Sequence, residues 1–158
     1  MKNENKTQTT PDVKNIFSQI ESTLELYFGQ KAPAMPVNIK EALVKYSPYI
    51  TLIVMILALP VILAIFGLGA MMSPFAYLGS YRAGINFSLT SIFALAVIIM
   101  QGLALPALFK RQISGWKFMY YAALIQVVEN LINFDLGSLI ISGAISFYIL
   151  FQIKSYYK

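Results

Sequence analysis

The sequence contains no cysteine and no histidine, and only 12% of its 158 residues are charged. Without cysteine there is neither a disulfide nor a thiolate nucleophile. Without histidine the side chain best suited to acid–base catalysis near neutral pH is missing, and zinc sites built from Cys and His are excluded. The sequence also has no Gly-rich phosphate loop and no nucleophile–base pair. We therefore expect no enzyme, no metal site and no cofactor.

The small number of charged residues also indicates whether water or lipid surrounds the folded chain. A soluble domain usually carries about 25% charged residues, whereas here 58% of the residues are hydrophobic. Such a surface favours a lipid bilayer over water. The net charge of +5 does not indicate a nucleic-acid partner, because the basic residues flank apolar segments and form no patch. The first ten residues are polar with no apolar run behind them, so we expect no signal peptide.

Four apolar segments have the length needed to cross a bilayer. They cover approximately residues 47–68, 87–109, 114–134 and 136–153. Short polar turns at 110–112 and 133–135 separate the last three, and Pro60 predicts a kink in the first. We expect an all-α integral membrane four-helix bundle with an amphipathic N-terminal interfacial helix, and a transmembrane domain spanning residues 47–153.

Residues 69–86 form the longest break between these segments. They are aromatic and apolar, but Pro74, Gly79 and Gly84 interrupt them. The interruptions predict an interfacial loop with at most one helical turn.

The N-terminal part divides into three expected pieces. Residues 1–10 are polar and predict a disordered tail. Residues 11–29 predict a helix that starts at Thr10-Pro11-Asp12. Its apolar stripe consists of Val13, Ile16, Phe17, Ile20, Leu24, Tyr27 and Phe28. This stripe indicates docking on lipid, on the bundle or on another protein, and the sequence leaves these open. Residues 30–46 predict a linker and a short interfacial helix.

Lysine and arginine are distributed unequally between the two ends of the predicted spans. With four spans, one side receives Lys31, Lys40, Lys45, Lys110, Arg111, Lys117, Lys154 and Lys158. The other side receives Arg82 alone. By the positive-inside rule both termini are cytoplasmic, residues 154–158 being a cytoplasmic tail of a multi-pass protein in the bacterial cytoplasmic membrane. An aromatic belt at the inner interface would then consist of Trp116, Tyr120, Tyr121, Tyr156 and Tyr157.

Two blocks of residues in the second half of the sequence resemble a known group of proteins. One is Leu-Pro-Ala-Leu-Phe-Lys-Arg at 105–111 with Ser-Gly-Trp-Lys at 114–117, and the other is residues 147–157. The chain resembles a family of small uncharacterised four-span membrane proteins of bacteria over roughly its last two thirds. The resemblance implies four spans and no established activity, and it transfers no functional residue.

One helix face could carry chemistry. Gln126, Glu129, Asn130 and Asn133 recur at helical spacing in the third segment, and Glu129 is the one acid inside an apolar run. Polar groups in hydrocarbon normally face a bundle interior or a hydrated cavity. The stripe therefore indicates either interhelical hydrogen bonds or a small, proton-accessible site. Arg82 is the expected partner of Glu129.

Two further polar features lie in the second and fourth segments. Gln101 is the strongly polar residue inside the second segment, and a hydrogen bond to a neighbouring helix is its expected role. In the fourth segment Ser138, Ser142 and Ser146 recur every four residues, which predicts close helix packing.

Two classes of function follow from these patterns. The first is a structural or interaction subunit of the membrane, either a homo-oligomer or bound to a membrane protein partner. The second is a small oligomeric transporter or channel that uses the polar stripe of the third segment. A hydrated stripe and a like-subunit interface would favour the second, and a monomer in which Glu129 is sealed against Arg82 would favour the first.

Overall fold

The computed structural model describes residues 13–158, except for the side chains of Val61, Ala70, Met72, Ser73, Ala76, Arg82 and Ala83. In this part of the chain the fold is all-α, with six α-helices and no strand. The expected tail at 1–10 and the helix start at Thr10-Pro11-Asp12 lie outside the described residues. The side chain of Arg82 does as well.

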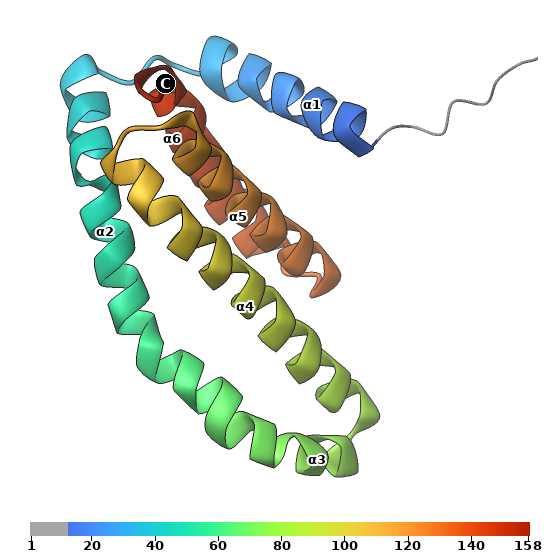
Figure 1. Cartoon of the computed structure of the whole chain (residues 1–158). Coiled ribbons are helices and arrows are strands. Elements are labelled where there is room, and N and C mark those ends of the chain that lie inside the picture. The colour runs from blue at the N-terminus through green and yellow to red at the C-terminus, as the bar shows by residue number, and fades with distance from the viewer. Residues whose placement is uncertain (1–12) are drawn as a thin grey trace, which may run out of the picture.

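Short connections join successive helices. Helices α1 and α2 each continue into a π-helical segment, and α6 continues into a 3-10 turn. Their bounds are α1 Val13–Leu24 with η1 Glu25–Lys31, α2 Val37–Leu63 with η2 Ala64–Gly69, α3 Ala70–Gly79, α4 Tyr81–Phe109, α5 Ile113–Ile132, and α6 Leu136–Ile153 with η3 Lys154–Tyr156. Figure 1 shows α2 and α4 as two long arms joined through α3 at one end of the molecule. The α5–α6 hairpin lies against the other end of α4, where α1 and the C-terminus also lie.

Three helices are long and apolar enough to cross a membrane, namely the stretches Val37–Gly69, Gly84–Phe109 and Leu136–Tyr156. They cover the first, second and fourth expected segments. The third segment forms α5, a helix of 20 residues that is not among these three. Its tyrosines and polar residues lower its hydropathy. Since α5 packs against both α4 and α6, much of its surface faces protein and need not be apolar.

Two breaks expected from the sequence are absent from the structure. Helix α2 runs through Pro48 without interruption, so the short helix and the first span are one helix. Proline removes a backbone donor from the helix, and the hydroxyl of Ser47 donates instead to the carbonyl of Val44 at 3.3 Å.

The expected loop at 69–86 is wrong as well, because α3 and the first turns of α4 occupy it. Helix α3 ends at Gly79 and α4 begins at Tyr81, whereas Pro74 and Gly84 lie inside these helices. A Cβ on Gly84 would overlap the ring of Tyr77, and a Cβ on Gly69 would lie 2.7 Å from the ring of Phe87. Glycine lets these helices approach closely, as small residues do in membrane bundles.

The core lies at the end of the molecule that α1 and the C-terminus share. Trp116 and Tyr120 stack with ring centroids 5.4 Å apart, and the indole N–H of Trp116 donates to the carbonyl of Leu150 at 2.7 Å. Both aromatic side chains are 1% exposed and Tyr157 is 5% exposed. The expected interfacial belt is therefore wrong for these three residues. They form a protein core because α6, the C-terminal turn and η1 cover them.

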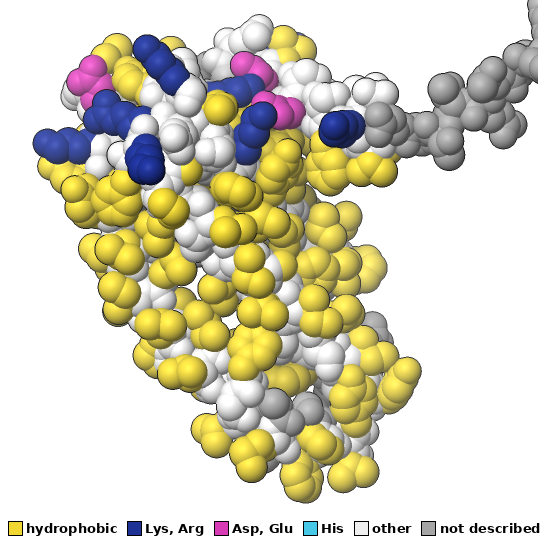
Figure 2. Space-filling view, viewed as in Figure 1, with side chains coloured by type: hydrophobic (Ala, Val, Ile, Leu, Met, Phe, Trp, Pro, Cys, Tyr) yellow, Lys and Arg dark blue, Asp and Glu magenta, His cyan; other side chains and the backbone are white. Residues whose placement is uncertain are grey.

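Charged side chains gather at this same end. Figure 2 shows them over α1, the start of α2 and the C-terminal region, while apolar side chains cover the rest of the visible face. Helix α1 is fastened here by Lys154, whose Nζ lies 2.9 Å from a carboxylate oxygen of Glu21 and 2.7 Å from one of Glu25. The ring of Phe17 contacts that of Tyr121 edge to face, 6.1 Å between centroids.

The apolar stripe of the N-terminal helix is only partly used by these contacts. Leu24 and Phe28 pack against the core, whereas Val13, Ile16 and Ile20 stay exposed. The sequence left open whether the stripe docks on lipid, on the bundle or on another protein. In the structure its C-terminal part packs on the bundle.

Candidate functional site

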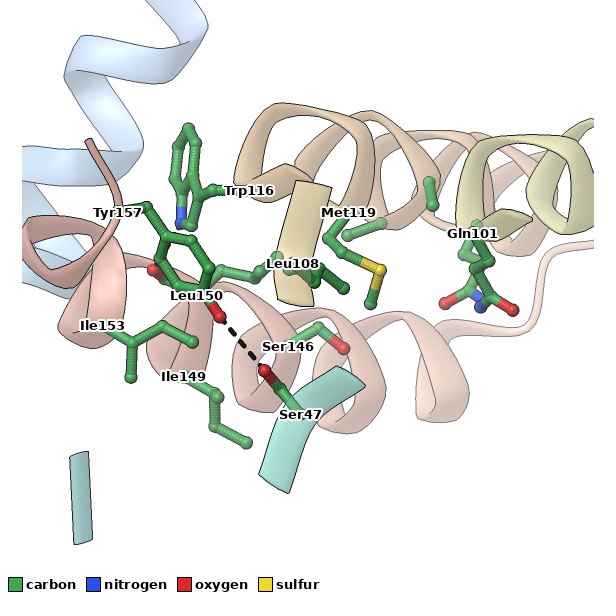
Figure 3. A pocket seen from close by; sticks show the side chains of 13 residues that line it. Ser47, Gln101, Leu108, Trp116, Met119, Ser146, Ile149, Leu150, Ile153 and Tyr157 are labelled. Atoms are coloured by element: carbon green, nitrogen blue, oxygen red, sulfur yellow. Dashed lines mark hydrogen bonds between the residues drawn. The ribbon is translucent and has the colours of Figure 1, made fainter. Parts of the chain in front are cut away.

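A cavity of about 270 Å³ lies between the helices just below the charged end. Helices α2, α4, α5 and α6 and the C-terminal segment all contribute to it. Its lining residues are Ser47, Gln101, Leu108, Trp116, Met119, Ala122, Ala123, Gln126, Ser146, Ile149, Leu150, Ile153 and Tyr157. Figure 3 shows Trp116 and Tyr157 at one end and Gln101 at the other, with Met119 and Ser146 between them. No charged side chain is among these lining residues.

Hydrogen bonds join α2, the α4–α5 turn and the C-terminal segment at the end of the cavity near the charged surface. The hydroxyls of Ser47 and Tyr157 lie 3.0 Å apart and form one hydrogen bond, in which either oxygen can donate. Burial raises the pKa of Tyr157. Two backbone bonds hold the last residue against the α4–α5 turn. The N–H of Lys158 donates to Arg111 O at 3.0 Å, and the N–H of Ile113 donates to Lys158 O at 2.8 Å. Residues 154–158, which the sequence predicted to be a cytoplasmic tail, are therefore packed against the α4–α5 turn.

Three further polar side chains line the cavity, each from a different helix. Gln101 comes from α4, Gln126 from α5 and Ser146 from α6. Within the described part of the chain none of their polar groups has a hydrogen-bond partner. The expectation that Gln101 bonds to a neighbouring helix is therefore not met there, although Gln101 and Gln126 do reach one cavity.

The remaining members of the polar stripe do not line this cavity. Glu129 and Asn130 are half-buried and Asn133 is exposed, near the end of α5. The carboxylate of Glu129 makes no ion pair with the described side chains. Because the side chain of Arg82 is not described, the Glu129–Arg82 pair stays a prediction. Along α5, Glu129 follows Gln126 by three residues and so continues the cavity-facing side by about one turn.

Two polar residues that sequence reasoning passed over organise the region around the cavity. The side chain of Gln152, 4% exposed, accepts from Met35 N–H at 3.1 Å and donates to Phe28 O at 3.0 Å. The hydroxyl of Tyr148 donates to Pro33 O at 2.8 Å. Both fasten the segment between η1 and α2 to α6. A glutamine in an apolar helix was the available signal for Gln152, as for Gln101.

The serine stripe of α6 divides between two roles. Ser142 donates its hydroxyl to the carbonyl of Ser138 within the same helix, and only Ser146 reaches the cavity. The amide of Ser138 also donates to the carboxylate of Asp135 at 3.1 Å, which caps the start of α6.

No family model fits the chain, and neither a curated protein nor a solved structure is significantly similar to it. The chemistry of the site therefore has to be argued from its own residues.

Proposed function

We propose that this chain is a multi-pass membrane protein that acts as an interaction subunit, docking a transmembrane helix of a second polypeptide along α2. In this proposal α2, α4, α5 and α6 cross the bilayer of a bacterial cytoplasmic membrane, with both termini and the charged end inside. Helix α5 supports a fourth crossing because its 20 residues span about 30 Å, the thickness of the hydrocarbon core. The excess of Lys and Arg at the charged end supports the orientation.

The threading has a direct test, since the chain contains no cysteine. Single cysteines at Gln112 and at Ser80 should show opposite accessibility to an impermeant thiol reagent in intact cells, with Ser80→Cys labelled from outside. Equal labelling, or labelling of Gln112→Cys alone, would contradict the orientation and the number of crossings.

The observation that carries the interaction proposal is the exposed surface around Gly67, which lies in η2 where it continues α2. In the apolar stretch Val37–Gly69, formed by α2 and η2, only 6% of the residues are buried, against 22% in the stretch of α4 and 28% in that of α6. A Cβ added to Gly67 would meet no other atom within 4 Å, whereas one added to Gly115 would lie 2.7 Å from the backbone N of Leu108. Small residues in membrane helices permit close helix approach. Gly115 is used in this way inside the chain, and Gly67 is available to a partner.

A photocrosslinking experiment tests this surface. A photoreactive amino acid in place of Ala64, which is exposed and lies three residues before Gly67 in η2, should give one discrete adduct in native membranes. An adduct of twice 17.7 kDa would identify the partner as a second copy, and another mass would identify a different membrane protein.

The matched variant is Gly67→Leu. It should reduce the adduct about tenfold, equivalent to about 1.4 kcal/mol, while the unfolding temperature in detergent stays unchanged. A photoreactive group at the exposed Ile141 of α6 serves as the control position. A smear of adducts from both positions, or an adduct insensitive to Gly67→Leu, would refute a specific docking surface on α2.

A small oligomeric transporter is the second candidate, and one observation favours it. Gln101 and Gln126 reach a common cavity, and Glu129 continues that side of α5 toward its far end. If protons or cations pass along this side, Glu129→Gln should abolish flux in proteoliposomes loaded with a pH-sensitive dye and leave stability nearly intact. Absence of flux in the parent protein, or full flux in Glu129→Leu, would exclude this path.

A further inference from the structure

The cavity contains polar groups with no hydrogen-bond partner among the described residues. Gln101 lies nine residues before Lys110, which follows α4, and Ser146 lies eight residues before Lys154, so both are about 12 to 14 Å from the charged end. Hydrocarbon begins well before that depth if the charged end marks the interface. An amide or hydroxyl without a hydrogen bond is costly there. A bound molecule would therefore supply the hydrogen bonds that the described residues do not give to Gln101, Gln126 and Ser146.

The lining excludes charged partners. It consists of neutral side chains throughout, and an ion transferred into such surroundings would lose its hydration without a compensating charge. Metal ions, phosphates and carboxylates are poor occupants for this reason. The two carboxamides can each donate two hydrogen bonds and accept others, and the hydroxyl can do both. A neutral carbonyl or hydroxyl oxygen satisfies them.

Water alone fits the cavity poorly. A volume of about 270 Å³ corresponds to about nine water molecules at about 30 Å³ each. Most of those waters would contact Leu108, Met119, Ile149, Leu150 and Ile153, and apolar cavities stay dry. An engineered apolar cavity of about 150 Å³ binds benzene, so this one has room for a ring or a short branched body with substituents.

We propose that this cavity binds a neutral, lipid-soluble carbonyl compound, with its oxygen atoms hydrogen-bonded to the polar side chains of Gln101, Gln126 and Ser146 and its apolar body against the apolar walls. Two lipid-soluble sources carry this chemistry, a benzoquinone and an acylglycerol ester. Three properties of this one cavity support the proposal. Its polar groups lack hydrogen-bond partners, its lining is neutral, and its volume suits a small organic molecule. The proposal is independent of docking at Gly67, which lies on η2 away from the cavity.

The protein carries its own reporter for this test. Trp116 is the single tryptophan of the chain and lines the cavity. A benzoquinone with a short alkyl tail is a fluorescence quencher and serves as the first probe, titrated into the full-length protein in detergent. A monoacylglycerol, which does not quench, serves as the second probe and is followed by the shift in unfolding temperature.

Saturable quenching by the quinone, or a saturable rise in unfolding temperature with the monoacylglycerol, is the expected result. The first outcome identifies the ring compound as the source of the carbonyl and the second identifies the acyl lipid. Gln101→Leu and Gln126→Leu should each weaken the saturable effect about tenfold, equivalent to about 1.4 kcal/mol. Gln112→Leu is the matched control, because Gln112 is exposed outside the cavity, and it should bind as the parent does.

Stability of the empty protein gives a second, independent readout. Gln101→Leu should leave the unfolding temperature without ligand unchanged or raise it, because an unpaired amide is replaced by an apolar group of similar size. A marked drop would show that the amide is paired within the protein and would overturn the proposal. Quenching that stays linear with probe concentration, with no thermal shift from either probe, would overturn it too. Equal affinity in Gln101→Leu, Gln126→Leu and the parent would have the same consequence.

Discussion

The two ends of this molecule are built from similarly apolar helices but are packed in opposite ways. At the charged end, Trp116 and Tyr120 are buried and α4, α5 and α6 meet closely. At the other end, α2, η2 and α3 leave large apolar side chains exposed, with Leu57, Leu68 and Leu78 each at least 69% exposed. Lipid chains are as apolar as leucine, so apolar character does not by itself bring membrane helices together.

Helix α5 shows what does bring them together. It is the least apolar of the four long helices, since the other three reach the hydropathy of a spanning segment and α5 does not. Yet it carries buried Gly115, Trp116, Tyr120, Ala122 and Ala123. Its small residues let the neighbouring helix approach, its rings fill the space between helices, and its indole N–H bonds across to α6. Close packing of α5 against both α4 and α6, rather than apolar area, distinguishes the charged end. At the other end α3 and α4 also meet closely, but α2 stays largely exposed.

The largest expected effect contrasts two glycines, one from each end. Gly115→Leu should destabilise the protein by more than about 3 kcal/mol, because the atoms it would overlap are backbone atoms that cannot move aside. A Cβ alone would lie 2.7 Å from Leu108 N and 2.9 Å from Ala107 C. Gly67→Leu should change stability by less than about 0.5 kcal/mol. Reversible unfolding in mixed micelles measures both, and comparable losses in the two variants would contradict the contrast between the ends.

A smaller effect is expected where α1 joins the packed end. Lys154→Met removes the bridges from Lys154 to Glu21 and Glu25, which are partly exposed and together contribute about 1 kcal/mol. Amide hydrogens of α1 should therefore exchange about fivefold faster, while those of α5 keep their rate. Lys117→Met is the matched control, since Lys117 is exposed and makes no ion pair with the described residues. Unchanged exchange in Lys154→Met would show that apolar contacts alone hold α1.

The smallest expected effect lies at the start of α6. Hydrogen bonds from the side chain and the backbone N–H of Ser138 lower the pKa of Asp135. A lowered folded-state pKa means that the carboxylate stabilises the helix start above the unfolded-state pKa, and that this stabilisation is lost as pH falls through the folded-state pKa. Exchange at the amide of Ser138 should accelerate over that acidic range in the parent and show no such step in Asp135→Asn. A step of equal size in the variant would assign the transition to another group.

The segments between helices show where sequence reasoning succeeded and where it failed. The polar turns expected at 110–112 and 133–135 coincide with the ends of α4, α5 and α6, because short polar runs between apolar helices have few alternatives. The expected loop at 69–86 was wrong because Pro74, Gly79 and Gly84 were all interpreted as helix breakers, whereas α3 runs through Pro74 and α4 through Gly84. Whether a glycine interrupts a helix or accommodates a neighbour depends on what lies opposite, here the ring of Tyr77.

Composition and periodicity by themselves determined that this chain is helical, that much of it is apolar enough for a membrane, and that its positive charge gathers at one end. These properties follow from residues close together along the chain. Only the tertiary structure decided that Gln101 and Gln126 line one cavity with Ser146. The relative height and rotation of α4, α5 and α6 set which side chains face each other, and the Gly115 contact and the Trp116 hydrogen bond help to fix both. Those contacts join residues on different helices, so no pattern within one helix could reveal them.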